Sequence, residues 1–113
     1  MRTPEARVPV VQLVRSSASV AANYRASCRA KSKRDFIAKL GTVIEESDES
    51  LFWLEYLVAT ALLTGTAVKE LQSESNELVA VFTTSQKTAR ANYIEEKNRR
   101  RALRYERPPQ TRS

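Results

Sequence analysis

The sequence predicts an all-α protein: an antiparallel up-down helical bundle of the four-helix-bundle type, in which this chain supplies three long helices. Apolar residues recur at intervals of three and four over most of the chain. That spacing keeps them on one face of an α-helix. The 113 residues include only two Gly and four Pro, too few for the frequent turns of an all-β fold.

The central helix, expected over residues 33–64, organises the bundle. Ser47 is the only interruption in its apolar seam, which consists of Ile37, Leu40, Ile44, Ser47, Leu51, Leu54, Val58 and Ala61. A second apolar row lies beside the seam and consists of Phe36, Val43 and Leu57. The stripe is therefore wide enough to touch two neighbouring helices. Ser32 and Asp35 predict a capping box at its start, and Gly65 is expected as the left-handed residue after its end.

The other two helices are expected on either side of the central one. The first should span residues 9–30, with Pro9 in its first turn, where proline is tolerated. Cys28 is expected there as a buried small residue. The third should span residues 66–97, with Thr66 as its cap and an apolar seam through Val68, Leu71, Ser75, Leu78, Phe82, Ser85 and Ala89. Residues 98–113 carry six Arg and two Pro and are expected to form a disordered basic tail.

Charge is segregated along the chain. Residues 1–40, 41–77 and 78–113 carry net charges of +7, −7 and +6. Short turns between long helices make neighbours antiparallel, so the first turn and the end of the third helix should share one pole. We expect this pole to bind RNA or DNA through Arg25, Arg29, Lys31, Lys33, Arg34, Lys39, Arg99, Arg100 and Arg101. Lys33 and Arg34 support the hypothesis because a helix dipole disfavours cations in a first turn.

Several kinds of function are excluded by composition. The chain has no His, which excludes His-based catalysis and His metal sites. It also offers no nucleophile–base pair or phosphate-cradling loop, so we expect no enzymatic activity, no catalytic residues and no cofactor. The carboxylates of residues 45–49 are expected to form a solvated face or ion pairs and not a metal site. The lone Cys28 favours a cytoplasmic setting, and no apolar stretch is long enough to span a membrane.

Two further sets of residues carry structural expectations. If the first turn pairs residue 30 with residue 34, Arg15 lies opposite Asp48 and Glu49, which predicts a partly buried interhelical ion pair beside Ser47. The apolar stripes are broader than three helices can cover, which favours an oligomer. We expect its contact residues to include the aromatic group Phe52, Trp53 and Tyr56.

The chain also resembles the 23S rRNA intervening-sequence protein family, small bacterial proteins usually described as four-helix bundle proteins. The likeness spans roughly residues 5–92 and is carried by Leu13-Val14-Arg15-Ser16, Ala22-Asn23-Tyr24-Arg25, Ser32-Lys33, Asp35-Phe36-Ile37, Lys39-Leu40-Gly41, Glu45-Glu46, Asp48-Glu49, Trp53-Leu54-Glu55, Asn76-Glu77-Leu78 and Lys87-Thr88-Ala89-Arg90. The resemblance implies an all-α bundle that assembles as a homopentameric ring, with no established enzymatic activity. The family has a further helix before the segment that starts here near Pro9, so we expect that first helix to be missing.

Two functions from different classes follow from these observations. The first is a non-enzymatic bundle protein that binds nucleic acid through the basic pole of an oligomeric ring. The alternative is a structural scaffold for a protein partner, without nucleic-acid binding. Binding that weakens steeply with salt would separate the first from the second.

Overall fold

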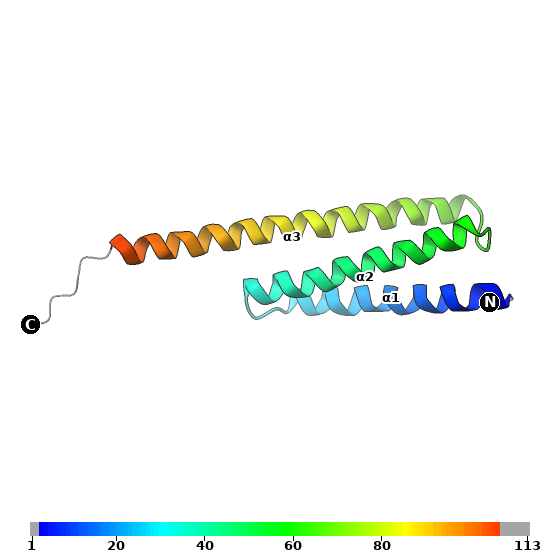
Figure 1. Cartoon of the computed structure of the whole chain (residues 1–113), viewed down its shortest axis with the longest axis horizontal. Coiled ribbons are helices and arrows are strands. Elements are labelled where there is room, and N and C mark those ends of the chain that lie inside the picture. The colour runs from blue at the N-terminus through cyan, green and yellow to red at the C-terminus, as the bar shows by residue number, and fades with distance from the viewer. Residues whose placement is uncertain (1–2, 107–113) are drawn as a thin grey trace, which may run out of the picture.

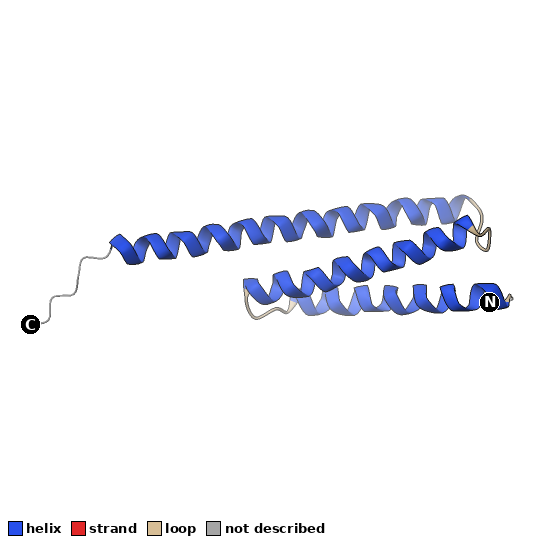
Figure 2. Ribbon diagram, in the orientation of Figure 1, coloured by secondary structure: helices blue, strands red, loops and turns tan. Residues whose placement is uncertain are grey.

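The computed structural model describes residues 3–106 as three long helices joined by short turns (Figures 1 and 2). They are α1 (Pro4–Cys28), α2 (Lys33–Ala59) and α3 (Thr66–Glu106). Successive helices run antiparallel, and α3 extends well past the turn between α1 and α2 (Figure 1). The predicted all-α class is confirmed, and the described residues include no strand.

Helix α2 packs against both of its neighbours and supplies the whole buried apolar core. The core consists of Leu40, Val43, Leu51, Leu54 and Leu57. Helices α1 and α3 meet through Tyr24 and Phe82, whose ring centroids are 5.7 Å apart. No residue of α3 is buried. Large apolar side chains stay exposed on both outer helices, among them Val8, Val11, Val14, Leu71, Leu78 and Val81.

Helix α1 begins earlier than the sequence indicated. Thr3 has an extended backbone and Pro4 occupies the first helical position, where its missing N–H costs nothing. Pro9 therefore lies in the second turn, and it is buried. The expectation for Cys28 was also wrong, because its side chain is exposed. Ser27 takes the buried position at this end of α1.

The start of α2 matches the predicted capping box. Ser32 has an extended backbone, and its hydroxyl accepts a hydrogen bond of 3.0 Å from the Asp35 N–H. The Asp35 carboxylate accepts in return from the Lys31 N–H at 3.3 Å. In the usual box the returning bond goes to the cap residue itself, here Ser32. Both bonds fix the direction in which α2 leaves the turn.

The predicted end of α2 was wrong, since the helix stops at Ala59 and not at residue 64. Ala61 has a φ of 58° and is the left-handed residue after the helix end, the place that the sequence assigned to Gly65. Gly65 also has a positive φ, of 113°, but it lies in the turn beyond that end. The Ala61 N–H donates to the Val58 carbonyl, and the Leu62 N–H donates to the Leu57 carbonyl, both at 3.0 Å. These are the two bonds of a Schellman motif, in which glycine is the usual left-handed residue.

Helix α3 begins at residue 66 as expected, but Thr66 is its first helical residue and not its cap, since the Lys69 N–H donates to the Gly65 carbonyl. The helix continues to Glu106, past the expected end at Lys97. Residues 98–106, which we call the α3 arm, contain no Gly or Pro, so nothing in them breaks the helix. Two ion pairs between residues one turn apart stabilise the start of the α3 arm. Arg99 lies 3.3 Å from Glu95, and Arg100 lies 2.8 Å from Glu96. This part of the expected disordered tail is helical, and residues 107–113 lie outside the described part.

Arg15 of α1 forms ion pairs with α2. It forms the predicted ion pair with Glu49, and its second partner is Glu46, at 3.6 Å, and not Asp48. Residues 46 and 49 share a face of α2, whereas Asp48 points to another side. The pair lowers the pKa of the Glu49 carboxyl, chiefly through its hydrogen bond from Arg15. The Arg15 side chain is 47% exposed, so the pair is more solvated than expected.

Serine residues from all three helices lie at one level of the bundle. Ser17, Ser47 and Ser75 line a small cavity of about 230 Å³ together with Val20, Ser50 and Leu78. Ser50 donates its hydroxyl proton to Ser16 Oγ at 2.8 Å or to the Glu46 carbonyl at 2.9 Å. Ser47 is 7% exposed, and its Oγ has no hydrogen-bond partner within the described residues.

The left-handed Ala61 predicts a stabilising substitution. We expect Ala61→Gly to raise the free energy of unfolding by about 1 kcal/mol, because glycine has no Cβ to oppose a positive φ. Urea unfolding followed by circular dichroism measures the change. In the control Ala91→Gly, within α3, glycine should cost about 1 kcal/mol instead. A loss of stability in both variants would contradict the conformation of Ala61.

The unpartnered Ser47 hydroxyl predicts a second stabilising change. We expect Ser47→Ala to raise the free energy of unfolding by about 1 kcal/mol, since it removes a buried polar group without a hydrogen bond. Ser50→Ala is the matched control, and losing its hydrogen bond should cost about 1 kcal/mol. The same urea titration compares them. Equal destabilisation by both would show that the Ser47 hydroxyl is satisfied in solution.

Candidate nucleic-acid interface

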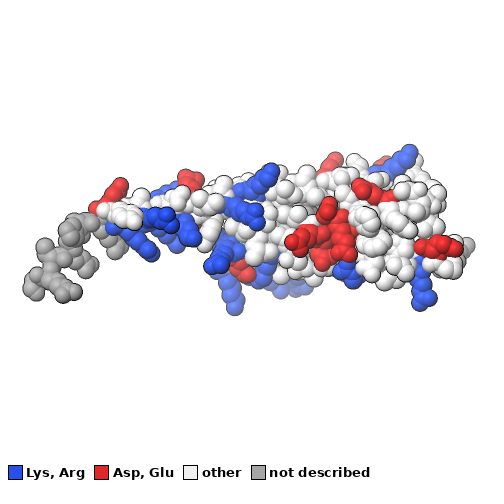
Figure 3. All heavy atoms as spheres, viewed as in Figure 1, with Lys and Arg blue, Asp and Glu red and all other residues white. Residues whose placement is uncertain are grey.

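Basic residues gather at the end of the molecule where α3 projects past the first turn. Figure 3 shows Lys and Arg along this part of α3 and beneath it, with acidic residues grouped nearer the middle of the rod. Antiparallel packing brings together the end of α1, the start of α2 and the last third of α3. We call this end the basic pole. It comprises Arg25, Arg29, Lys31, Lys33, Arg34, Lys39, Lys97, Arg99, Arg100, Arg101 and Arg104.

A groove of about 600 Å³ runs between the start of α2 and α3 at this pole. Ser32, Lys33 and Arg34 line it from the α2 side. The α3 side consists of Tyr93, Glu96, Lys97, Arg100, Arg101 and Arg104. The structure therefore unites four of the predicted residues, which come from distant parts of the sequence, in one site that we call the basic groove.

The other predicted basic residues lie elsewhere on the pole. Arg25, Arg29 and Lys39 line a shallow depression between α1 and α2. Lys31 lines a third hollow together with Cys28 and Phe36. Arg99 pairs with Glu95 of its own helix and lines none of these hollows. The sequence correctly identified a basic end of the molecule, but its nine residues do not form one continuous site.

Glu96 and Tyr93 are residues of the groove that sequence reasoning missed, and Glu96 has a structural role there. Its carboxylate lies 2.5 Å from Lys33 Nζ and 2.8 Å from Arg100 NH2, so it links α2 to α3. Lys33 opposes the dipole of α2, yet Glu96 compensates that cost within the chain. Across a short turn between antiparallel helices, residues at equal distances from the turn face each other. The same rule, applied to the turn between α2 and α3, would have placed Lys33 within about one helical turn of Glu96.

Several cations of the pole have no acidic partner within the described residues. In and beside the basic groove these are Arg34, Lys97, Arg101 and Arg104, and further round the pole they are Arg25, Arg29 and Lys31. Lys97 Nζ lies 5.8 Å from the centroid of the Tyr93 ring. Lys39 is paired with Asp35 at 2.8 Å. The positive charge that remains favours an anionic ligand at this pole.

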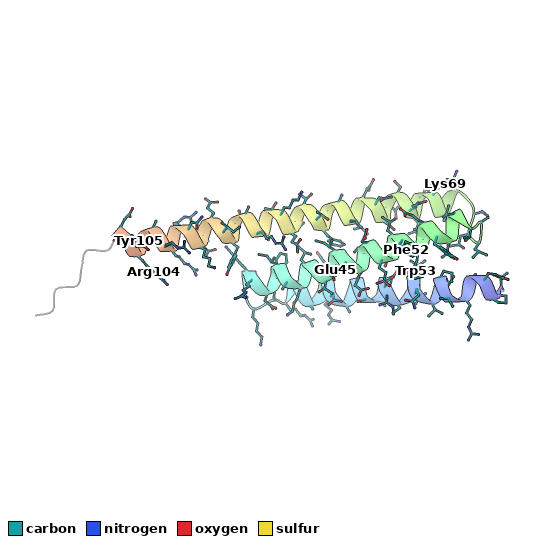
Figure 4. The ribbon with its side chains drawn as sticks, in the orientation of Figure 1. Glu45, Phe52, Trp53, Lys69, Arg104 and Tyr105 are labelled. Atoms are coloured by element: carbon teal, nitrogen blue, oxygen red, sulfur yellow. The ribbon has the colours of Figure 1, made fainter. Side chains whose placement is uncertain are left out.

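The predicted oligomer contacts form a compact aromatic cluster on α2. Phe52 and Trp53 meet edge to face, with ring centroids 4.9 Å apart, and Trp53 meets Tyr56 in the same way at 5.9 Å. Phe52 and Tyr56 are exposed. Figure 4 places Phe52 and Trp53 on α2, far from Arg104 and Tyr105 on the α3 arm. The role of the cluster in assembly stays a prediction.

Residues 3–106 offer neither a metal site nor a membrane span. No group of three or more His, Cys, Asp or Glu side chains there could hold a metal ion. None of the three helices is long and apolar enough to cross a membrane.

The fold and its basic end define a small all-α helical-bundle protein. A family model described as 23S rRNA-intervening sequence protein matches residues 3–84, and the chain belongs to this family. The match ends before Tyr93 and the α3 arm.

A solved structure supports the same assignment. The chain is similar to a protein of unknown function from the S23 ribosomal protein family of Bacteroides thetaiotaomicron VPI-5482, with 32% sequence identity and a TM-score of 0.67. The similarity covers 71% of this chain and 74% of that one. No curated protein matches the sequence.

The bridge through Glu96 predicts a dependence of stability on pH. Lys33 lowers the pKa of the Glu96 carboxyl, mainly through its hydrogen bond. A lowered pKa in the folded state contributes stability at neutral pH that is lost as the pH falls through that pKa. Lys39 and Arg15 lower the pKa values of Asp35 and Glu49 in the same direction. We expect the thermal midpoint to fall between about pH 5 and pH 3.

Glu96→Gln tests how much of this dependence belongs to the bridge. We expect it to lower the midpoint at pH 6 and to flatten the acid branch of the profile. Glu95→Gln is the matched control, because Glu95 pairs only within α3. If both variants show the same midpoint and the same acid branch, the link between α2 and α3 does not contribute to stability.

Proposed function

We propose that this protein is a non-enzymatic, cytoplasmic nucleic-acid-binding protein that contacts phosphates through the basic groove and acts as an oligomer. The observation that carries the proposal is the convergence of Lys33 and Arg34 with the basic residues of α3. Cations from the beginning of one helix and the end of another line the same groove. Several of them have no acidic partner within residues 3–106, so their charge is available to an outside anion.

Phosphates are the ligands that such a groove suits best. A polyanion that enters it exchanges its counterions for Lys and Arg side chains, and the released ions make binding favourable at low salt. Contacts to phosphate carry no sequence information, so we expect little sequence preference. The family description names 23S rRNA, which makes RNA the first nucleic acid to test.

Assembly would strengthen such binding. Exposed apolar residues on α1 and α3, and the aromatic cluster on α2, are surfaces that favour contacts between subunits. The family resemblance implies a homopentameric ring. A ring would repeat the basic groove around its axis, and several weak contacts to one strand would then add to the avidity.

The same apolar surface supports the alternative function, a scaffold for a protein partner. Leu71, Leu78 and Val81 are each at least half exposed along α3. A scaffold would use these residues and would leave the charge of the basic pole as a solvated surface. The two functions therefore differ in whether the pole affects binding of an oligonucleotide.

We expect Arg34→Gln with Arg101→Gln to weaken binding of a mixed-sequence 20-nucleotide RNA roughly tenfold at 50 mM salt. The slope of log affinity against log salt should decrease by roughly 1.5, at about 0.7 to 0.9 for each phosphate that the variant no longer neutralises. Fluorescence anisotropy at 50 and 200 mM salt measures both quantities.

A control pair removes equal charge at the opposite end of the rod. Arg7→Gln with Lys69→Gln lies near the start of α1 and the start of α3, where Figure 4 shows Lys69. This variant should bind RNA within about twofold of the parent. If both pairs of substitutions weaken RNA binding equally, the net charge of the protein and not the basic groove determines binding. If the parent protein binds no RNA, the scaffold function replaces this proposal.

A further inference from the structure

Tyr93 is the one aromatic residue among those that line the basic groove. It is half-buried, on the face of α3 that also carries Lys97 and Arg100. Lys97 Nζ is 5.8 Å from the ring centroid, at the outer limit of a cation–π contact. A groove that held phosphates alone would have no use for an aromatic ring, whereas a ring surrounded by cations suits a nucleobase with its adjoining phosphates.

The aromatic ring of Tyr93 limits which form of nucleic acid can use the whole basic groove. Bases inside a duplex already stack on one another, so they offer no free face to the ring, whereas an unpaired base does. The groove itself is held by the Glu96 bridge between the start of α2 and α3. Glu96 already accepts bonds from Lys33 and Arg100, and the groove keeps an excess of positive charge.

We propose that the basic groove binds single-stranded nucleic acid, with one unpaired base stacked on Tyr93 and the adjoining phosphates held by Arg34, Lys97 and Arg101. This inference rests on the proposed function and names the form of its ligand. Lys97 leaves the ring for a phosphate when the base arrives, because a solvated cation–π contact at this distance is weaker than base stacking. Tyr93 lies beyond residue 84, outside the range that the family model matches.

The α3 arm provides a matched control residue. Tyr105 is 85% exposed and does not line the basic groove. Figure 4 places it next to Arg104 on the α3 arm. Tyr105→Leu therefore removes the same type of ring from the same helix without changing the groove. Tyr93→Phe keeps the stacking surface and removes only the hydroxyl.

The test compares three labelled 12-nucleotide RNAs by fluorescence anisotropy: a single strand, the same strand in a duplex, and a single strand of equal charge with abasic sites. We expect Tyr93→Leu to weaken binding of the normal single strand roughly tenfold. Its binding of the duplex and of the abasic strand should stay within twofold of the parent. Tyr93→Phe and Tyr105→Leu should bind all three RNAs within twofold of the parent.

The possible results separate this inference from the proposed function. If Tyr93→Leu binds the normal strand as well as the parent, while Arg34→Gln with Arg101→Gln weakens it, the groove binds phosphates without stacking. An equal loss for all three RNAs would assign Tyr93 a structural role and also overturn the inference. If Tyr93→Leu loses helicity, the comparison of two RNAs with the parent protein decides. The inference then requires the parent to bind the normal single strand at least fivefold more tightly than the abasic strand. Absence of any RNA binding by the parent contradicts the proposed function itself.

Discussion

Leu40, Val43, Leu51, Leu54 and Leu57 form the buried apolar core, and all five belong to α2. Because this helix is apolar on two sides, it holds α1 and α3 without requiring them to pack closely against each other. The outer helices contribute half-buried and exposed side chains, so the described residues form an open arrangement of three helices. Removal of water from the faces of α2 is the interaction on which the orientation of every other element depends.

The basic groove follows from a difference in length between two packed helices. Helix α2 begins at Lys33, whereas α3 continues past that level to Glu106, so one side of α3 has no neighbour beyond the first turn within the described part of the chain. Lys33 and Glu96 join the helices where their contact ends. The cations that follow on α3 then face open solvent on one side and the start of α2 on the other. A simple offset between helix ends thus produces a concave, positively charged surface.

Hydrophobic periodicity was sufficient to predict three helices, because the repeat of apolar residues decides which face of each helix is buried. The short turns between the helices predicted that neighbours run antiparallel. The short first turn also predicted the register that brings Arg15 to Glu49. The end of α2 could not be found in this way, since a Schellman motif normally uses Gly and here uses Ala61. Composition likewise suggested a disordered segment where residues 98–106 continue the helix through ion pairs one turn apart. For the site, the sequence identified the basic pole but not Glu96 or Tyr93, whose importance depends on the register of α3.

The unsupported α3 arm gives α3 a gradient of local stability. Near its start the helix rests on α2, while residues 98–106 have only their own hydrogen bonds and side-chain pairs to hold them. A helical segment of that kind opens from its free end one turn at a time and does not require the bundle to unfold. Amide hydrogens should therefore exchange fastest at the end of α3 and progressively more slowly toward the level of Phe82. Neutralising the clustered guanidinium groups would remove their mutual repulsion and extend protection outward along the arm.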